Sequence, residues 1–155
     1  MKRIALQPRL RLLAEMTPPG GRLADIGTDH GYLPVWLLQQ GRITGAVASD
    51  LRPGPLERAR GTAEKYGLTG RMDFRLCDGL SGIQPDEVNT IAMAGMGGET
   101  IAAILAAAPW TWERECLLLL QPMSAQPFLR RWLQAHDYTI RRELLSREGD
   151  TLYTT

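Results

Sequence analysis

The residues best suited to chemistry lie in the stretch ADIGTDHGYLP, residues 24–34. Two carboxylates, Asp25 and Asp29, and the imidazole of His30 occupy a glycine turn between a predicted buried strand and a predicted helix. Turns of this kind usually bind phosphate, because free backbone N–H groups open the helix that follows. Two unit charges about 4 Å apart interact by roughly 4 kcal/mol at an effective dielectric constant of 20, so these acids would repel a diphosphate. The turn therefore predicts a cationic ligand.

Acidic residues also follow the next two predicted strands. Asp50 ends the second strand, and Asp78 ends the third, just before Gly79. Since ligands of open parallel sheets bind beyond the carboxyl ends of the strands, these acids and Asp25 should surround one crevice. An acid about 20 residues past a glycine turn also occurs in dinucleotide-binding folds, where it binds a ribose, but such a fold would not explain the acids of the turn. An NAD-binding oxidoreductase is therefore the weaker interpretation.

S-adenosylmethionine fits such a crevice, because it carries an ammonium group and a sulfonium but no phosphate. We expect Asp25 to bind the amino group, and the free N–H groups after Gly31 to bind the methionine carboxylate. Asp50 would accept from the ribose hydroxyls and Asp78 from the adenine amine. The residues expected to bind this donor are Asp25, Gly27, Thr28, Gly31, Asp50, Leu51, Asp78, Gly79, Ala94, Gly95 and Met96.

The fourth predicted strand ends in AGMGG, residues 94–98. Its glycines let the backbone approach a flat ligand, and Met96 could cover that ligand. A strand-to-helix turn that needs small residues explains Gly97 and Gly98 equally well. The acids have structural explanations too, since Asp25 could bond to turn amides and Asp50 could cap the next helix. Their joint occurrence at successive strand ends favours the ligand site.

The elements that must position these residues alternate along the chain. Apolar or β-branched runs predict buried strands at residues 22–26, 44–49, 71–76, 88–93 and 114–120. Apolar residues at helical spacing lie between them, and a further helix is expected at about residues 4–17. Parallel neighbours need such crossovers, whereas EGD near the end of the chain predicts the turn of an antiparallel hairpin.

This order of elements predicts an α/β protein with the class I (Rossmann-like) methyltransferase fold. We expect a mostly parallel seven-stranded sheet with helices on both faces and a C-terminal antiparallel hairpin. Residues 1–155 are expected to form a single domain, because this length suits one core.

Composition excludes several classes of protein. Apolar residues make up 44% and charged residues 23% of the chain, which is ordinary for a soluble globular protein. The formal net charge is only +1, so nucleic acid would have to bind to local basic patches. Candidate patches, for which solvated surface is the simpler explanation, are Lys2, Arg3, Arg9 and Arg11, and Arg130, Arg131, Arg141 and Arg142.

Localisation and metal content follow from what the chain lacks. The longest aliphatic run, residues 117–120, is too short to span a bilayer, and no secretory signal is apparent, so we expect a cytoplasmic protein. Cys77 and Cys116 lack metal-site spacing, and His30 and His136 are the only imidazoles. We therefore expect no bound metal, free thiols, no membrane association and no obligate protein partner.

Several motifs together resemble a known family. The stretches RLADIGTDHGYLP, ASDLRPGPLERA, RLCDGL, IAMAGMGGETIAAIL and LLLQP are similar to the bacterial TrmK family, the tRNA adenine-N1 methyltransferases that modify adenine 22. The resemblance implies tRNA as partner and S-adenosylmethionine as methyl donor, with S-adenosylhomocysteine as product. It implies catalytic roles for Asp29 and His30, which match the active-site turn of the family. The residues expected to contact the substrate are Tyr32, Gly97, Gly98, Gln121 and Pro122.

The chain departs from the family pattern in two places. Family members continue into a helical coiled-coil region thought to help grip tRNA, which is absent from these 155 residues. Met123 also stands where an asparagine is expected after LQP, which affects a polar contact in the substrate pocket. A small-molecule methyltransferase and a non-catalytic module that binds S-adenosylmethionine or RNA therefore stay open as alternatives.

In the hypothesis that we prefer, Asp29 and His30 orient the target base, and Asp29 accepts a hydrogen bond from its exocyclic amine. Adenine N1 already has a lone pair, so alignment is the main requirement and can supply roughly 7–11 kcal/mol. A paired or stacked adenine would first have to be turned outward.

Overall fold

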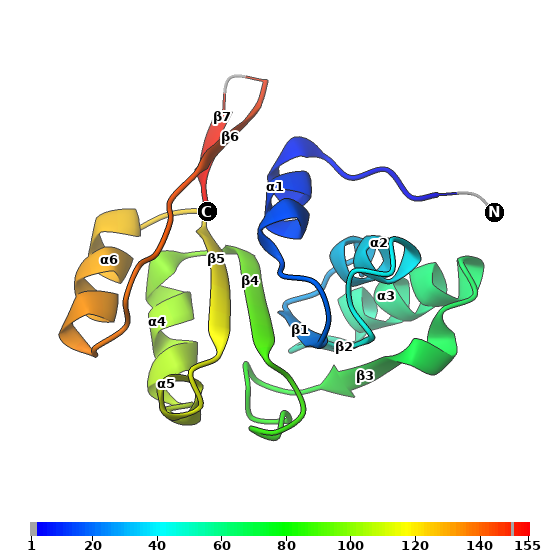
Figure 1. Ribbon diagram of the computed structural model, residues 1–155, viewed down its shortest axis with the longest axis horizontal. Coiled ribbons are helices and arrows are strands. Elements are labelled where there is room, and N and C mark those ends of the chain that lie inside the picture. Colours follow the sequence, from blue (N-terminus) through cyan, green and yellow to red (C-terminus); the bar gives the residue numbers. More distant parts are fainter. Residues whose placement is uncertain (1–2, 150) are drawn as a thin grey trace.

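A parallel sheet of five strands lies at the centre of the structure, a computed structural model that describes residues 3–149 and 151–155. Its strands are β1 (Arg22–Ile26), β2 (Gly45–Asp50), β3 (Met72–Leu76), β4 (Thr90–Met96) and β5 (Leu117–Pro122). They lie in the order β3-β2-β1-β4-β5, and every pair is parallel (Figure 1). The order reverses between β1 and β4, and a ligand of an open α/β sheet binds beside such a reversal.

Helices cover both faces of this sheet, as the sequence predicts. On one face lie α1 (Pro8–Met16), α2 (Tyr32–Gln39) and α3 (Pro53–Lys65). On the other lie α4 (Gly98–Ala106) and α6 (Gln126–Ala135). Two short helices, η1 (Thr69–Arg71) and α5 (Trp110–Glu113), lead into β3 and β5.

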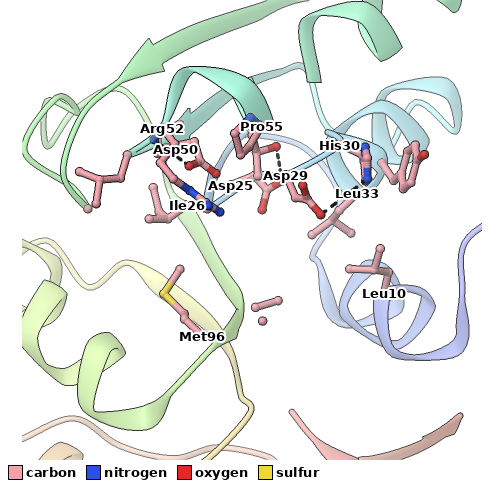
Figure 2. A pocket seen from close by; sticks show the side chains of 18 of the residues that line it. Leu10, Asp25, Ile26, Asp29, His30, Leu33, Asp50, Arg52, Pro55 and Met96 are labelled. Carbon is pink, nitrogen blue, oxygen red and sulfur yellow. Dashed lines mark hydrogen bonds and ion pairs between the residues drawn. The ribbon is translucent and has the colours of Figure 1, made fainter. Parts of the chain in front are cut away.

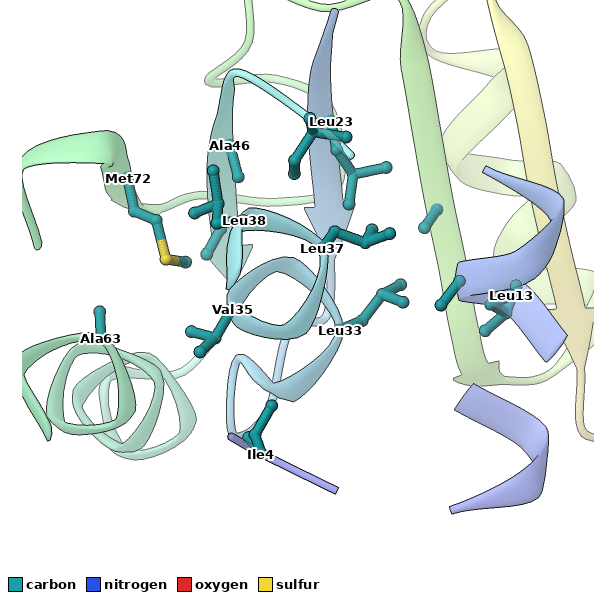
Figure 3. Close-up of a cluster of buried hydrophobic side chains, with 14 of the residues drawn as sticks. Ile4, Leu13, Leu23, Leu33, Val35, Leu37, Leu38, Ala46, Ala63 and Met72 are labelled. Atoms are coloured by element: carbon teal, nitrogen blue, oxygen red, sulfur yellow. The ribbon is translucent and has the colours of Figure 1, made fainter. Parts of the chain in front are cut away.

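The core has two halves because successive strand residues point to opposite faces. Leu23 of β1 packs with Leu33 and Leu37 of α2 on one side (Figure 3). The next residue, Ala24, packs with Ile101 of α4 on the other. All five side chains are 2% exposed or less, so the sheet is held firmly between its helices.

The predicted seven-stranded sheet is wrong. The remaining two strands, β6 (Leu145–Glu148) and β7 (Thr151–Thr154), pair with each other as a separate antiparallel hairpin. This hairpin packs against α1 (Figure 1), where Arg9 Nε lies 3.7 Å from Glu148 Oε2. The predicted hairpin is therefore present, but its strands pair with each other and do not extend the parallel sheet. Lys2 of the predicted basic patch and Asp150 of the predicted turn lie outside the described residues.

Among the element boundaries that differ from the prediction, two have clear local reasons. The N-terminal helix begins at Pro8 rather than near residue 4, because Gln7 has extended backbone angles and proline favours the first turn of a helix. The last parallel strand begins at Leu117, because α5 and a left-handed Glu115 (φ 53°) occupy the residues just before it. Within residues 3–149 and 151–155, every helix is too short or too polar to cross a membrane.

Candidate functional site

A cavity of about 1310 Å³ opens at the carboxyl ends of the strands, beside the reversal of strand order. We call it the strand-end cavity. Its walls come from the N-terminal segment and α1, from the turns after β1 to β4, from α3 and from one side of α4. Figure 2 shows Asp25, Asp29 and Asp50 along one wall, with Met96 across the cavity from them.

The turn after β1 is held by its neighbour strand and by its own backbone angles. The N–H groups of Gly27 and Thr28 both donate to the carbonyl of Ser49, each at 3.0 Å. Gly27, Asp29 and Gly31 have φ of 69°, 56° and 70°, which places three of five successive residues in the left-handed region. Glycine adopts this region readily, whereas an aspartate there is uncommon. The turn therefore presents the Asp29 side chain in an unusual direction.

Asp25 is a buried carboxyl group at the bottom of the cavity. It is 6% exposed, and Thr28 Oγ1 donates to its Oδ2 over 2.8 Å. Burial raises the pKa of Asp25 from 3.8 to about 7; the Thr28 bond opposes that rise, and the charges of Asp50 and Asp29 add to it. A cation beside Asp25 would offset both the cost of burying the ionised carboxylate and its repulsion by Asp50 and Asp29.

Asp50 and Asp78 complete the acidic wall. Asp50 is 9% exposed, and its Oδ1 accepts from the backbone N–H of Arg52 at the start of α3. Asp78 is exposed and lines the same cavity after β3. The structure thus brings together the three acids that the sequence places at successive strand ends.

The end of β4 forms the facing wall through an irregular backbone. Its register with β5 shifts between Ala94 and Met96, and Gly95 between them has φ 80°. A Cβ on Gly27 would lie 2.8 Å from Met96 Cε, so the two walls approach closely at this point. The opening between them therefore suits a flat or narrow group.

Most of the predicted site residues line the strand-end cavity, and a few do not. Those that line it are Asp25, Gly27, Thr28, Asp29, His30, Tyr32, Asp50, Leu51, Asp78, Gly79, Ala94, Gly95 and Met96. Gly31, Gly97, Gly98, Gln121 and Pro122 are not among the described residues that line it. Met123, which stands where an asparagine was expected, does line it and is 45% exposed.

Three of the glycines serve close packing. A Cβ on Gly98 would lie 2.6 Å from the carbonyl oxygen of Ala125, and a Cβ on Gly31 would lie 3.1 Å from Ala59 Cβ. A Cβ on Gly97 would meet Ser124 Oγ at 2.9 Å. Gly98 and Gly31 therefore need a small residue whatever the cavity binds, whereas the Ser124 side chain could rotate away from a Cβ on Gly97.

Gln121 is fully buried and bonded within the protein. Its Nε2 donates to the carbonyl of Arg9 at 3.1 Å and to Thr155 Oγ1 at 2.8 Å. The Arg9 guanidinium donates back to Gln121 Oε1 at 3.4 Å. This amide joins α1, β5 and the residue after β7, and it lies away from the cavity wall.

One wall of the cavity was not predicted from the sequence, the side of α4 that carries Thr100, Ala103 and Ile104, with Ala107 just after the helix. These residues recur at intervals of three and four, so helical periodicity places them on one stripe. Ile104 packs against the core and also faces Gly79, where an added Cβ would lie 3.0 Å from the Ile104 side chain. Arg58 was also missed. It lies on α3, and its Nη2 donates to Asp29 Oδ1 over 3.0 Å.

Among the described residues, no group of three or more His, Cys, Asp or Glu side chains could hold a metal ion. His30 stacks on Tyr32, with ring centroids 4.9 Å apart and planes 18° apart. Its Nε2 lies 3.8 Å from Asp29 Oδ2. The mouth of the cavity therefore carries a carboxylate beside two stacked rings.

Comparisons with known proteins agree with this geometry. A family model described as a methyltransferase domain matches residues 6–155. A tRNA (adenine(22)-N(1))-methyltransferase of Bacillus subtilis strain 168 is 36% identical over 153 residues, which are 99% of this chain and 64% of the relative. The chain thus spans less than two thirds of the length of that relative.

Solved structures of methyltransferases are similar to this chain in both sequence and fold. A Streptococcus pneumoniae protein in complex with S-adenosyl-L-methionine is 35% identical, with a TM-score of 0.90 over 97% of this chain and 71% of that chain. TrmK of M. capricolum in complex with S-adenosyl-homocysteine is 31% identical, with a TM-score of 0.85 over 96% of this chain and 66% of that chain. This chain belongs to the methyltransferase-domain family and, within it, to the TrmK family.

Proposed function

We propose that this chain transfers a methyl group from S-adenosylmethionine to N1 of an adenine in tRNA, at adenine 22. The observation that carries the proposal is the convergence of Asp25, Asp50 and Asp78 on one cavity at the reversal of strand order. Two of these carboxylates are buried, and a buried charge needs a partner. The TrmK relatives support tRNA adenine as the acceptor.

The residues present suit the methionine end of the donor. Asp25 would pair with the ammonium group, which removes the repulsion among the neighbouring acids. The first backbone N–H groups of α2, at Tyr32 and Leu33, have no acceptor within the helix and would bind the carboxylate.

The adenosine end suits the other two acids. Asp50 uses Oδ1 to accept from the Arg52 N–H, which leaves its Oδ2 for the ribose hydroxyls. Asp78 would accept from the adenine amine. The apolar side of α4 around Ile104 would pack against one face of the ring, because an aromatic base is stabilised by contact with apolar groups.

The transfer itself needs alignment more than acid–base chemistry. S-adenosylmethionine supplies a methyl group on a positive sulfur, and that C–S bond breaks as the N1 lone pair of adenine forms the new C–N bond. Asp29 would accept a hydrogen bond from the exocyclic amine, which strengthens as positive charge develops on the ring. His30 and Tyr32 would contact the base beside Asp29.

We also propose tRNA as the macromolecular partner and the cytoplasm as the place of action, because the substrate of the TrmK relatives is tRNA. Arg9 of α1 lines the cavity and could contact a phosphate near the target adenine.

The decisive experiment incubates the purified chain with unmodified tRNA and donor carrying a labelled methyl group. Nucleoside mass spectrometry should find 1-methyladenosine, and tRNA with guanine at position 22 should stay unlabelled. A calorimetric titration with S-adenosylhomocysteine should detect one site per chain.

Two outcomes would replace the proposal with its alternatives. If neither tRNA nor a metabolite pool is labelled while S-adenosylhomocysteine binds, the chain is a non-catalytic binding module. If label appears in a metabolite pool and not in tRNA, the acceptor is a small molecule.

A further inference from the structure

One helix, α3, contacts the catalytic turn through two adjacent residues. Ala59 of α3 lies beneath Gly31, where a Cβ would come within 3.1 Å of its own Cβ. The residue before it, Arg58, reaches the side chain of Asp29. Adjacent residues of α3 thus contact both the backbone and the carboxylate of the turn.

Arg58 takes one side of the Asp29 carboxylate. The distance from Arg58 Nη2 to Asp29 Oδ1 is 3.0 Å, whereas the other oxygen, Oδ2, lies 3.8 Å from His30 Nε2. A charge-assisted hydrogen bond to one oxygen restricts rotation of the carboxylate. Oδ2 therefore faces the ring of His30 (Figure 2). That ring stacks on Tyr32.

Arg58 is not among the described residues that line the strand-end cavity, whereas Asp29 and His30 are. Among the residues that line the cavity, Arg58 therefore acts through Asp29, the one to which its guanidinium donates. Both side chains are well exposed, Arg58 at 49% and Asp29 at 62%, and exposed ion pairs contribute little to the stability of a fold. Orientation of Asp29 is the role that remains for this contact.

We propose that Arg58 is a positioning residue, which holds the Asp29 carboxylate at the angle needed to accept from the exocyclic amine of the target adenine. This inference rests on the proposed function. It extends that function by assigning a specific role to α3, which contributes no proposed contact of its own with the base.

The test measures steady-state methylation of tRNA at saturating donor for four proteins: wild type, Arg58→Ala, Arg58→Lys and Arg60→Ala. Arg60 is the matched control, because it lies on the same helix at 40% exposure and pairs with Glu57 instead of the turn. We expect kcat of Arg58→Ala to fall by about 10- to 100-fold, since small misplacements have effects of this size. Arg58→Lys should recover part of the loss, and Arg60→Ala should match wild type.

Two further measurements separate positioning from a structural role. The affinity of all four proteins for S-adenosylhomocysteine should agree within about twofold, because the donor contacts are intact. In an Asp29→Asn background, adding Arg58→Ala should change the residual kcat by less than about twofold, because the effect of Arg58 passes through Asp29. A purely structural role would lower kcat by the same factor in both backgrounds.

The outcomes distinguish this inference from the function on which it rests. Equal kcat for Arg58→Ala and Arg60→Ala, with active wild type, would overturn the role of Arg58 and leave the methyl transfer standing. Loss of S-adenosylhomocysteine affinity in Arg58→Ala would also overturn it. Wild type that forms no 1-methyladenosine would overturn both.

Discussion

Asp25 is the residue at which binding and stability oppose each other most directly. The carboxyl is buried among the acids of the cavity wall, and burial is the main reason why its pKa is raised from 3.8 to about 7. An ionised carboxylate in this place destabilises the free protein and attracts a cationic ligand. The same physical cause therefore predicts a more stable but weaker-binding variant.

We expect Asp25→Asn to change how stability depends on pH. Because the folded-state pKa exceeds the unfolded value, the folded protein binds the extra proton between pH 3.8 and about 7, and wild-type stability falls as pH rises through that window. The loss is roughly 4 kcal/mol at most, and asparagine removes it. Denaturant unfolding at pH 5 and pH 8 checks this. Equal pH dependence in the two proteins would contradict the burial of a titrating carboxyl.

Donor affinity should follow the opposite trend with pH. Asp25 must ionise before it pairs with an ammonium group, so the affinity of wild type for S-adenosylhomocysteine should rise by up to about tenfold per pH unit below pH 7 and level off above it. Asp25→Asn should bind weakly and with little change between pH 6 and pH 8. Calorimetry at several pH values measures both curves, and a flat wild-type curve would assign the ammonium to another group.

Asp29 should affect turnover and not donor binding. Asp29→Ala removes the carboxylate at the mouth of the cavity while leaving Asp25 and Asp50 in place, so methylation of tRNA should be abolished with S-adenosylhomocysteine affinity largely retained. Parallel methylation and titration measurements on one preparation test this. Normal turnover in the variant would remove Asp29 from the mechanism.

At the scale of elements, the site depends on how two strand-to-helix turns are held. The turn after β1 is tied to the carbonyl of Ser49 on β2. The start of α4 is tied to the loop after β5, since Gly98 N donates to the carbonyl of Ser124 at 2.8 Å. Each turn is thus anchored to a neighbouring strand or loop, so the cavity walls keep a defined separation.

Gly98→Ala should lower the free energy of unfolding by about 1–3 kcal/mol. The new Cβ would lie 2.6 Å from the backbone oxygen of Ala125, which cannot move without displacing the start of α6. Gly61→Ala is the matched control, because a Cβ in the middle of α3 meets nothing within 4 Å and alanine favours a helix by roughly 0.5–1 kcal/mol. Denaturant unfolding should therefore give changes of opposite sign. A neutral Gly98→Ala would contradict the close packing.

At the scale of the whole molecule, the strand-end cavity joins the two halves of the core. Its walls include α1 and α3 from one face of the sheet and α4 from the other. A ligand in the cavity contacts both layers, so it binds the folded chain and not the unfolded one. Binding must then stabilise the fold as a unit.

S-adenosylhomocysteine at about 100 times its dissociation constant should raise the free energy of unfolding by roughly 2.7 kcal/mol. NAD at the same concentration should have no effect, because its diphosphate would lie beside the acids of the cavity wall. Thermal unfolding with each ligand compares the two directly. Stabilisation by NAD would contradict the electrostatic basis of the site.

The sequence by itself determined the local features of this protein. Strand-length apolar runs alternate with helical stripes, and an acid lies at or just after the carboxyl end of each of the first three strands. The α/β fold and the acidic crevice could therefore be predicted from periodicity and order. Parallel strands bring their carboxyl ends to one edge, so the convergence of Asp25, Asp50 and Asp78 follows from topology alone.

Only the tertiary structure decided which groups meet across distant segments. Gln121 lies near the end of a strand, like the acids, yet its amide donates hydrogen bonds to Arg9 and Thr155 and not to a ligand in the cavity. The hairpin packs on α1 instead of extending the sheet, and Arg58 reaches Asp29 across 29 positions of sequence. Periodicity reports which face of an element is apolar, but a polar contact depends on the positions of two elements at once, and their packing is a property of the whole chain.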